Sequence, residues 1–340
     1  MKQVIFDKKN ILIFGGAGFL GSHLCEELVK NNKIICVDNF VSSSVENIRF
    51  LMQLPNFRFI KHDIAQPLIL ENCLELKDFK IEFQGIQEIY NLACPTSAKN
   101  FDNYIIETLD ANSLALKNIL ELVKKYQAKF VHASSAVVYG PRQDEFTNLA
   151  ENYLGVVDFT SPRSSYDEGK RFAETMCINY RNFYKLPIKI ARVFRTYGPR
   201  MLLNDGQMIP DFIVNALENK DLVIYGNANF STSLAYISDV IDGLVRLMDS
   251  SHEDIYNIGS DVEFKLEDVA KSIIKMTDSH SSIIFKDPLA FITPLSVPDI
   301  SKIRNDLDWF PITKLEEGLE KTIEYTKANK ILITNGHQPS

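Results

Sequence analysis

A tyrosine, a lysine and a serine have the types and spacing that proton transfer requires. Tyr166 and Lys170 are four residues apart in a segment with a helical pattern, so a helix places both on one face. A phenol with a pKa of about 10 is a poor base at neutral pH, but a nearby ammonium favours the phenolate and lowers that pKa. Ser135 follows an apolar strand-like run and could orient the oxygen of a substrate hydroxyl. The three residues indicate removal of a proton from an alcohol. The alternative is that Tyr166 and Lys170 are an ordinary pair on an amphipathic helix.

A glycine-rich turn near the N-terminus indicates where the hydride of such an alcohol would go. Gly15, Gly18 and Gly21 separate an apolar run from a helical pattern, and we expect a side chain at these positions to keep a pyrophosphate from the helix N-terminus. A second strand-like run ends in Asp38, whose carboxylate is placed to accept hydrogen bonds from the adenosine ribose and to repel a 2′-phosphate. The motif predicts NAD rather than NADP; the alternative is a tight strand–helix turn without a ligand.

Alternating strand and helix patterns must position these residues. Repeated units of this kind predict an α/β fold with a Rossmann-like, doubly wound parallel sheet, in which a cofactor lies across the carboxyl ends of the strands. The candidate strands are Ile11–Phe14, Lys33–Val37, Phe57–Lys61, Glu88–Leu92, Lys129–Ala133 and Ile188–Val193. The candidate helices are Asn103–Tyr126, Ser165–Tyr184, Gln207–Glu218, Ser238–Met248, Leu266–Met276 and Lys314–Thr326.

The pattern changes after Val193, where turn signals become frequent. We therefore predict an NAD-binding domain over 1–194 with a return segment at about 236–260, and a smaller C-terminal substrate-binding lobe over 195–235 and 261–327. Residues 328–340 have the pattern of a frayed tail, and the mixed charges of 72–83 indicate a solvated surface element.

Composition excludes several classes of function. The 340 residues carry a net charge of −7 without a basic block, which argues against nucleic acid, and no apolar run approaches the length of a membrane helix. The first ten residues lack a signal-peptide core. The five cysteines and six histidines show no metal-ligand spacing, so we expect reduced cysteines, a cytoplasmic protein and no metal site.

Several stretches together carry a family resemblance. They are 15–24, 37–40, 61–64, 91–95, 161–174 and 197–201, with a weaker match at 298–300 and 307–309. They resemble extended short-chain dehydrogenases/reductases that act on nucleotide sugars, and are most similar to UDP-glucuronate decarboxylases. The resemblance implies NAD, a nucleotide-diphosphate sugar as substrate, and a homodimer. The helices near 103–126 and 165–184 are the candidate dimer face; the alternative is that this face is buried within the chain. The resemblance also implies these cofactor contacts, in addition to Gly21: Gly15, Gly18, Phe19, Leu20, Asp38, Asn39, Asp63, Ile64, Leu92, Ala93, Tyr166, Lys170 and Val193.

Departures from the family pattern bear on the reaction. Decarboxylases and 4,6-dehydratases carry an acid two residues after the strand-end hydroxyl, where this chain has Val137, and decarboxylases have an arginine where this chain has Ser296. The stretch 135–140 is instead similar to that of sugar 4-epimerases. The resemblance therefore supports oxidation of the sugar, and the missing side chains argue against decarboxylation or dehydration.

Further departures concern the substrate. Thr232 stands where the family usually has an arginine for the diphosphate, and Arg195 where it has an asparagine. Arg195 could supply the missing charge, because guanidinium groups suit phosphate oxygens, or it could be a structural arginine. With Ser135 and Arg200, these residues are the predicted substrate contacts.

The sequence thus predicts an NAD-dependent nucleotide-sugar oxidoreductase with Tyr166 as proton acceptor, Lys170 as its electrostatic helper and Ser135 as the orienting hydroxyl. By family analogy hydride leaves C4 to give a 4-keto sugar, and the enzyme ends as a 4-epimerase or a 4-dehydrogenase. The alternatives are a UDP-glucuronate decarboxylase-type enzyme, a 4-keto-sugar reductase, and a regulator that binds NAD without catalysis.

Overall fold

The computed structural model describes residues 8–96, 101–142, 148–203, 205–226, 229–287 and 294–335. Its centre is a seven-stranded sheet with the order β12-β7-β5-β4-β1-β2-β3, in which every neighbouring pair is parallel. These strands are β1 (Asn10–Phe14), β2 (Lys33–Asp38), β3 (Phe57–Lys61), β4 (Glu88–Asn91), β5 (Lys129–Ser135), β7 (Ile188–Val193) and β12 (Ile255–Ile258). All six predicted strands are confirmed; β12 was not among them, and it completes one edge of the sheet.

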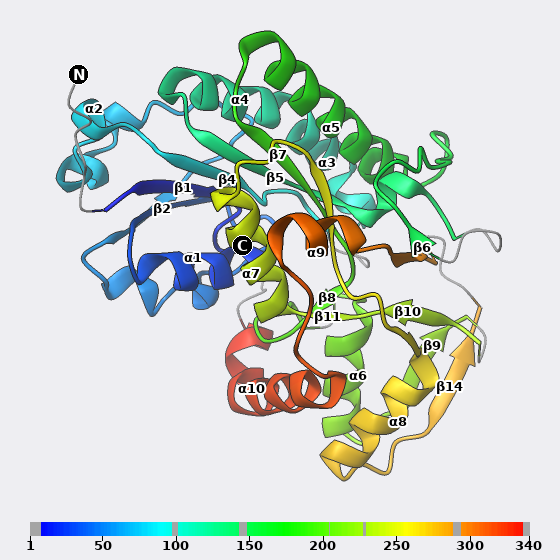
Figure 1. Cartoon of the computed structure of the whole chain (residues 1–340). Helices are drawn as coiled ribbons and strands as arrows, with labels where there is room; N and C mark the ends of the chain where they lie inside the picture. Colours follow the sequence, from blue (N-terminus) through cyan, green and yellow to red (C-terminus); the bar gives the residue numbers. More distant parts are fainter. Residues whose placement is uncertain are drawn as a thin grey trace.

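Helices cover both faces of the sheet, as the doubly wound prediction requires (Figure 1). On one face lie α3 (Ile105–Asn112), α4 (Leu114–Tyr126) and α5 (Ser164–Tyr184); on the other lie α1 (Phe19–Val29) and α7 (Ile237–Asp249). The sheet strands read as near-continuous apolar runs because both faces are buried; Ile11 to Phe14, for example, are at most 1% exposed. The single helix expected near 103–126 is interrupted at Ser113, which separates α3 from α4.

The direction of winding reverses at β1. The chain proceeds from β1 to β2 and β3 on one side, and then continues with β4, β5 and β7 on the other. Loops after neighbouring strands therefore diverge at the carboxyl ends of β1 and β4, which is where open α/β sheets bind ligands.

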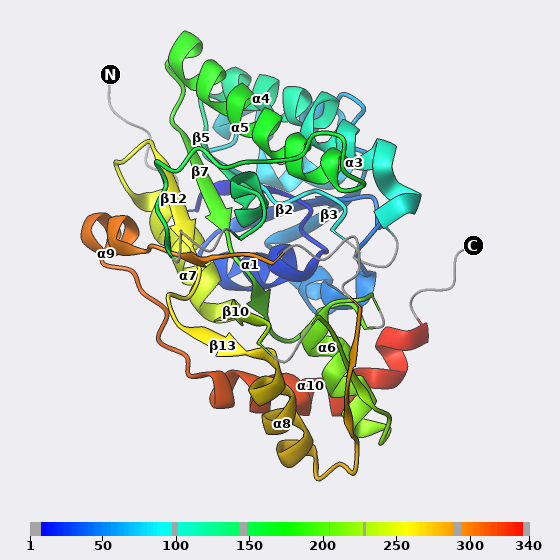
Figure 2. The same cartoon turned by 90° about the vertical axis from the view of Figure 1, so that its right-hand side faces the viewer.

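A smaller lobe lies beside the carboxyl ends of the strands (Figure 2). Its helices are α6 (Met208–Leu217), α8 (Leu266–Thr277) and α10 (Leu315–Asn335), and the short α9 (Ser301–Leu307) packs against β12. Its strands form two-stranded pairs: β9 (Leu222–Tyr225) with β14 (Ile283–Lys286), and β10 (Ser231–Ser233) with β13 (Glu263–Lys265). Two further pairs, β8 (Thr196–Tyr197) with β11 (Ala235–Tyr236) and β6 (Asn148–Leu149) with β15 (Val297–Pro298), complete the described strands.

The structure differs in part from two expectations about surface segments. α10 continues to Asn335, so the described part of the predicted tail, 328–335, is helical. Residues 70–84 form short 3-10 helices and α2 (Ile81–Gln84), and Leu76, Phe79 and Ile81 are at most 4% exposed. The charges that suggested a solvated element lie between these apolar residues, which pack into the core beside the sheet.

Candidate active site

A cavity of about 660 Å³ lies between the carboxyl ends of the sheet strands and the smaller lobe. Strands β1, β2, β3, β4, β5 and β7 all end at it, and residues 201–202 and 205–209 of the lobe line it as well. Every predicted cofactor contact lines it: Gly15, Gly18, Phe19, Leu20, Asp38, Asn39, Asp63, Ile64, Leu92, Ala93, Tyr166, Lys170 and Val193. Gly21, Ser135 and Arg195 line it too.

The three glycines of the turn have different reasons to be glycine. A Cβ at Gly21 would lie 2.0 Å from the Gly15 oxygen, and a Cβ at Gly15, whose φ is +72°, would lie 2.7 Å from the Ala93 nitrogen. These two glycines therefore let backbone segments approach each other, rather than clearing a pyrophosphate as we expected. At Gly18 a Cβ would approach only the Gly15 oxygen, at 3.2 Å. Gly18 is also the N-cap of α1 and supplies no side-chain cap, so the first N–H groups of α1 face the cavity region.

Asp38 ends β2 and holds the loops around it. One carboxylate oxygen accepts the Ala17 N–H at 3.0 Å, and the other accepts the Phe40 N–H at 2.9 Å and the Ser43 hydroxyl at 2.7 Å. Because a carboxylate offers about four acceptor positions, Asp38 keeps acceptor capacity toward the cavity that it lines.

The structure brings the three predicted catalytic residues together. Ser135 ends β5, Tyr166 lies in the first turn of α5, and their side chains are hydrogen-bonded to each other. The Ser135 oxygen also accepts the Val137 N–H at 3.4 Å. Lys170 lies one helical turn after Tyr166, with its Nζ 5.9 Å from the centre of the phenol ring. Because Tyr166 also contacts Ser135 of a different element, Tyr166 and Lys170 are more than an ordinary pair on one amphipathic helix.

The electrostatics around Tyr166 differ from our expectation. Burial is the largest influence and raises the pKa of Tyr166 well above its usual value, and the nearby Cys94 thiol raises it further. The Ser135 hydrogen bond and the Arg163 guanidinium act in the opposite direction but are weaker. Lys170 is 4% exposed and donates to the Ala133 carbonyl oxygen at 2.9 Å. The expected lowering of the phenol pKa is therefore outweighed by desolvation in the chain alone.

Two further residues line the cavity near this set. Val137 is 5% exposed and lies in the short 3-10 helix η6 (Ala136–Tyr139), for which Ser135 is the N-cap. Cys94 follows β4, and its Sγ receives a hydrogen bond of 3.3 Å from the Asn112 amide. The valine side chain has no proton to transfer.

A pair of arginines faces the same cavity. Arg163, the N-cap of α5, contacts both oxygens of Asp167 and lies 6.0 Å from the centre of the Tyr166 ring. Arg195 follows β7, and its Nη1 is 3.7 Å from the Met208 sulfur at the start of α6. Burial lowers the pKa of Arg195 to about 10, and the positive charge of Arg163 adds to this effect. The Asp167 carboxylate offsets part of this charge, and the positive charge that remains at this wall favours an anionic ligand there.

The structure does not bring two of the predicted substrate contacts to the cavity. The guanidinium of Arg200 pairs with Glu26 of α1 and packs 4.9 Å from the centre of the Phe50 ring, so it links α1 to the loop after β2. Thr232 is 2% exposed within β10, and its hydroxyl donates to the Ser233 carbonyl oxygen. Ser296 is 2% exposed and outside the cavity lining, although its neighbour Leu295 belongs to it.

Sequence reasoning gave no role to several residues of the cavity wall. Arg163 was part of a matching motif without an assigned function, and the acidic side chains of Glu107, Asp110 and Asp205 were not considered. Arg163 could have been suspected, because it stands three residues before Tyr166 at the start of the same helix. Among the described residues there is no cluster of His, Cys, Asp and Glu that could hold a metal ion. Of the described helices, none is both long and apolar enough to span a membrane.

Comparisons with known proteins agree with this architecture. The family model described as GDP-mannose 4,6 dehydratase matches residues 12–322. UDP-glucuronic acid decarboxylase 1 from Xenopus tropicalis is 37% identical over 94% of this chain and 72% of its own length. The protein of the same name from Arabidopsis thaliana is 35% identical over 95% of this chain and 70% of its own length.

Solved structures that are similar to this chain include nucleotide-sugar epimerases. UDP-glucuronic acid 4-epimerase from Bacillus cereus, solved with UDP-glucuronic acid and NAD, has a TM-score of 0.81 and 27% identity over 94% of this chain and 99% of its own. UDP-glucose 4-epimerase from Thermotoga maritima, solved with UDP-glucose, has a TM-score of 0.82 and 25% identity over 94% of this chain and 99% of its own. The chain belongs to the GDP-mannose 4,6-dehydratase family of extended short-chain dehydrogenases/reductases.

Proposed function

We propose that this chain binds NAD and a nucleotide-diphosphate sugar, removes hydride from C4 of the sugar, and ends as a 4-epimerase or a 4-dehydrogenase. The observation that carries the proposal is the hydrogen-bonded pair of Ser135 and Tyr166, with Lys170 beside the phenol ring, in the cavity that the glycine turn borders. A regulator that only binds NAD has no need for this set.

The residues present fit NAD. The uncapped N-terminus of α1 at Gly18 suits a pyrophosphate, and the remaining acceptor capacity of Asp38 suits the adenosine ribose hydroxyls. A carboxylate at that place repels a 2′-phosphate, which favours NAD over NADP. When bound, NAD supplies the hydride acceptor and a positive charge on its nicotinamide ring.

Side chains of the protein itself orient the sugar hydroxyl and accept its proton. Ser135 orients the sugar hydroxyl toward Tyr166, whose phenolate oxygen accepts its proton. Because burial raises the pKa of Tyr166, the phenolate depends on compensating positive charge, and the Arg163 guanidinium already acts in that direction. The geometry adds Lys170 as a second source, because its Nζ lies 5.9 Å from the centre of the phenol ring. The Ala133 carbonyl holds the Lys170 ammonium in that place.

The side chain at Val137 bears on the fate of the oxidised sugar. Epimerisation and dehydrogenation require only the machinery that moves hydride and the hydroxyl proton. Decarboxylation and dehydration involve a further acid or base, and at the position beside Ser135 this chain offers a buried aliphatic side chain. Returning hydride to the opposite face of the ketone makes a 4-epimer, whereas releasing the ketone leaves reduced cofactor that an external oxidant must restore.

A UDP-glucuronic acid decarboxylase-type activity is the second candidate. The names of the curated relatives at 35–37% identity favour it. The arginine pair of Arg163 and Arg195 also suits a carboxylate of the sugar as well as it suits a diphosphate.

The exposed apolar side chains of α3 and α5 support a homodimer. Ile106 is 65% exposed and Leu109 42% on α3, and Phe172 is 51% exposed on α5. Because α3 and α5 pack side by side, these side chains suit a second copy of the same helices. A cytoplasmic location remains our proposal, based on cysteines that are all free where the structure describes them.

One experiment distinguishes these outcomes. The pure protein, with its NAD content measured, is incubated with UDP-, GDP-, CDP- and dTDP-sugars while NADH absorbance and product mass are followed. A new isomer of unchanged mass supports a 4-epimerase, and loss of two hydrogens with accumulation of NADH supports a 4-dehydrogenase. Loss of CO2 supports the decarboxylase candidate, net consumption of added NADH by a keto-sugar supports a reductase, and no reaction contradicts the proposal.

A further inference from the structure

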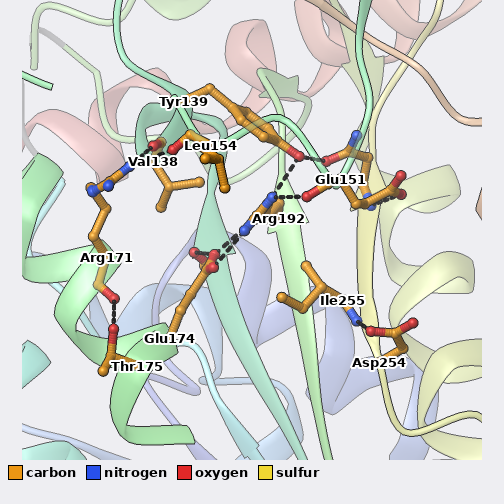
Figure 3. A network of polar contacts seen from close by, with 12 residues as sticks. Val138, Tyr139, Glu151, Leu154, Arg171, Glu174, Thr175, Arg192, Asp254 and Ile255 are labelled. Carbon is orange, nitrogen blue, oxygen red and sulfur yellow. Dashed lines mark hydrogen bonds and ion pairs between the residues drawn. The ribbon is translucent and has the colours of Figure 1, made fainter. Parts of the chain in front are cut away.

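A buried ion pair joins α5 to β7 of the sheet (Figure 3). Glu174 of α5 and Arg192 of β7 are 6% and 8% exposed. Arg192 donates from Nε to one carboxylate oxygen at 2.9 Å and from Nη2 to the other at 2.7 Å. The Ser134 hydroxyl of β5 donates to the same carboxylate at 2.6 Å. One carboxylate thus links a helix to two strands.

The second terminal nitrogen of Arg192 extends these links. Nη1 donates to the Tyr139 hydroxyl at 2.8 Å and to the Glu151 carbonyl oxygen at 2.9 Å, and the guanidinium carbon lies 4.7 Å from the centre of the Tyr139 ring. The Tyr139 hydroxyl donates in turn to the Asn257 amide oxygen of β12 at 2.7 Å. Figure 3 shows these contacts converging on Arg192 from both sides.

Three residues of this network, Ser134, Glu174 and Arg192, lie close in the sequence to residues of the candidate site. Ser134 precedes Ser135, and Glu174 lies one helical turn beyond Lys170. Arg192 precedes Val193, and Ser134 is paired with Arg192 in the register of β5 and β7. Neither Glu174 nor Arg192 lines the cavity, so neither is placed to touch a ligand there.

Stability alone is a weak reason for such a pair. Removing two charges from water is costly, and replacing a buried ion pair by apolar residues of similar size is often neutral or stabilising. A bidentate guanidinium–carboxylate contact does, however, fix the distance and orientation of its two elements. Here that contact joins α5 to β7, and the Ser134 hydroxyl ties β5 to the same carboxylate. Ser135 lies on β5 and Tyr166 on α5, so their mutual hydrogen bond depends on how α5 is placed against these two strands.

We propose that Glu174 and Arg192 form a positioning pair that, through Ser134, holds the end of β5 and the start of α5 in the relative placement that hydride removal requires. The proposal rests on the proposed function for its kinetic consequence. Its structural consequence, local order at 133–139, does not depend on the substrate.

The test uses the full chain with Glu174→Gln, the double variant Glu174→Met/Arg192→Met and the control Arg181→Met. The single variant leaves a buried guanidinium without its charged partner and can fail to fold, whereas the double variant removes both charges with similar volume. Arg181 lies on the same helix but donates to the Glu253 carbonyl, away from the set.

For the double variant we expect a folded protein with a single cooperative melting transition and unchanged binding of NAD. On a sugar that the wild type turns over, KM should hold and kcat should fall roughly 100-fold, as a small misplacement of reacting groups produces. Hydrogen exchange of the amides of 133–139 should accelerate while that of β1 stays as in the wild type. Arg181→Met should match the wild type throughout.

Other outcomes overturn the proposal in distinguishable ways. An unchanged kcat, or equal acceleration of exchange across the whole sheet, means that the pair is merely structural. If the wild type turns over no nucleotide sugar, the proposed function fails, and the exchange measurement still decides whether the pair orders 133–139 locally.

Discussion

Replacing Lys170 by methionine should displace the pH dependence of hydride transfer rather than abolish the reaction. The Lys170 nitrogen lies 5.9 Å from the centre of the Tyr166 ring and is 4% exposed. With the 5.9 Å to the ring centre taken as the separation of the two charges, and an effective dielectric constant of about 20, the ammonium stabilises the phenolate by about 3 kcal/mol. That energy corresponds to about 100-fold in the population of the phenolate at pH 7. Since burial already raises the pKa of Tyr166, little phenolate is present at neutral pH, and a further fall in its population lowers the rate in proportion.

The assay is a single-turnover measurement of NADH formation at saturating NAD and sugar, from pH 6 to pH 10. For the wild type the rate should rise about tenfold per pH unit until the phenol ionises in the complex. For Lys170→Met the rising limb should move upward by about two pH units, with the rate at high pH largely recovered. Arg181→Met is the control, because Arg181 lies on the same helix but donates to the Glu253 carbonyl, outside the candidate site. A profile for Lys170→Met that is parallel to the wild type at every pH would refute the reasoning.

Three further predictions concern cofactor binding, acid stability and assembly. Gly21→Ala should abolish NAD binding in calorimetry, because the new Cβ would lie 2.0 Å from the Gly15 oxygen. Gly18→Ala should fold, and NAD binding by Gly21→Ala equal to that of the wild type would contradict the loop geometry. Burial lowers the pKa of His23 from 6.5 to about 4. As the pH falls below 6.5, the unfolded chain takes up a proton at His23 before the folded chain does, so the folded state loses stability until the pH reaches about 4. In chemical denaturation, the wild type should lose about 3 kcal/mol more than His23→Gln between pH 7 and pH 4, and equal losses would exclude this cause. Phe172→Glu should convert a dimer into a monomer in light scattering, and a persistent dimer would point to another face.

Much of this site could be predicted because the sequence places it at the ends of strands. Each apolar run that predicts a strand is followed by the residue that faces the cavity, as at Asp38 and Ser135. In a parallel sheet those ends meet at one edge, so the type of fold alone brings distant residues together. The helical spacing of Tyr166 and Lys170 adds the remaining pair.

The features that could not be predicted depend on the surroundings of a side chain. The pKa of Tyr166 moves upward because of desolvation, which a sequence does not display. Arg163 and Arg195 line the same cavity although they belong to different elements, and Arg200 lies within a matching stretch yet pairs with Glu26. Likewise, Glu174 and Arg192 read as ordinary charged residues until the fold buries them together.

The most direct test of the central claim is the fate of UDP-glucuronic acid on the NAD-loaded protein, followed by product mass and NADH absorbance in one quenched time course. We predict a sugar nucleotide of unchanged mass, or one that has lost two hydrogens with matching NADH, and no product after Tyr166→Phe. Rapid release of CO2 would contradict the account, because it would mean that a group other than the side chain at Val137 serves the step after oxidation.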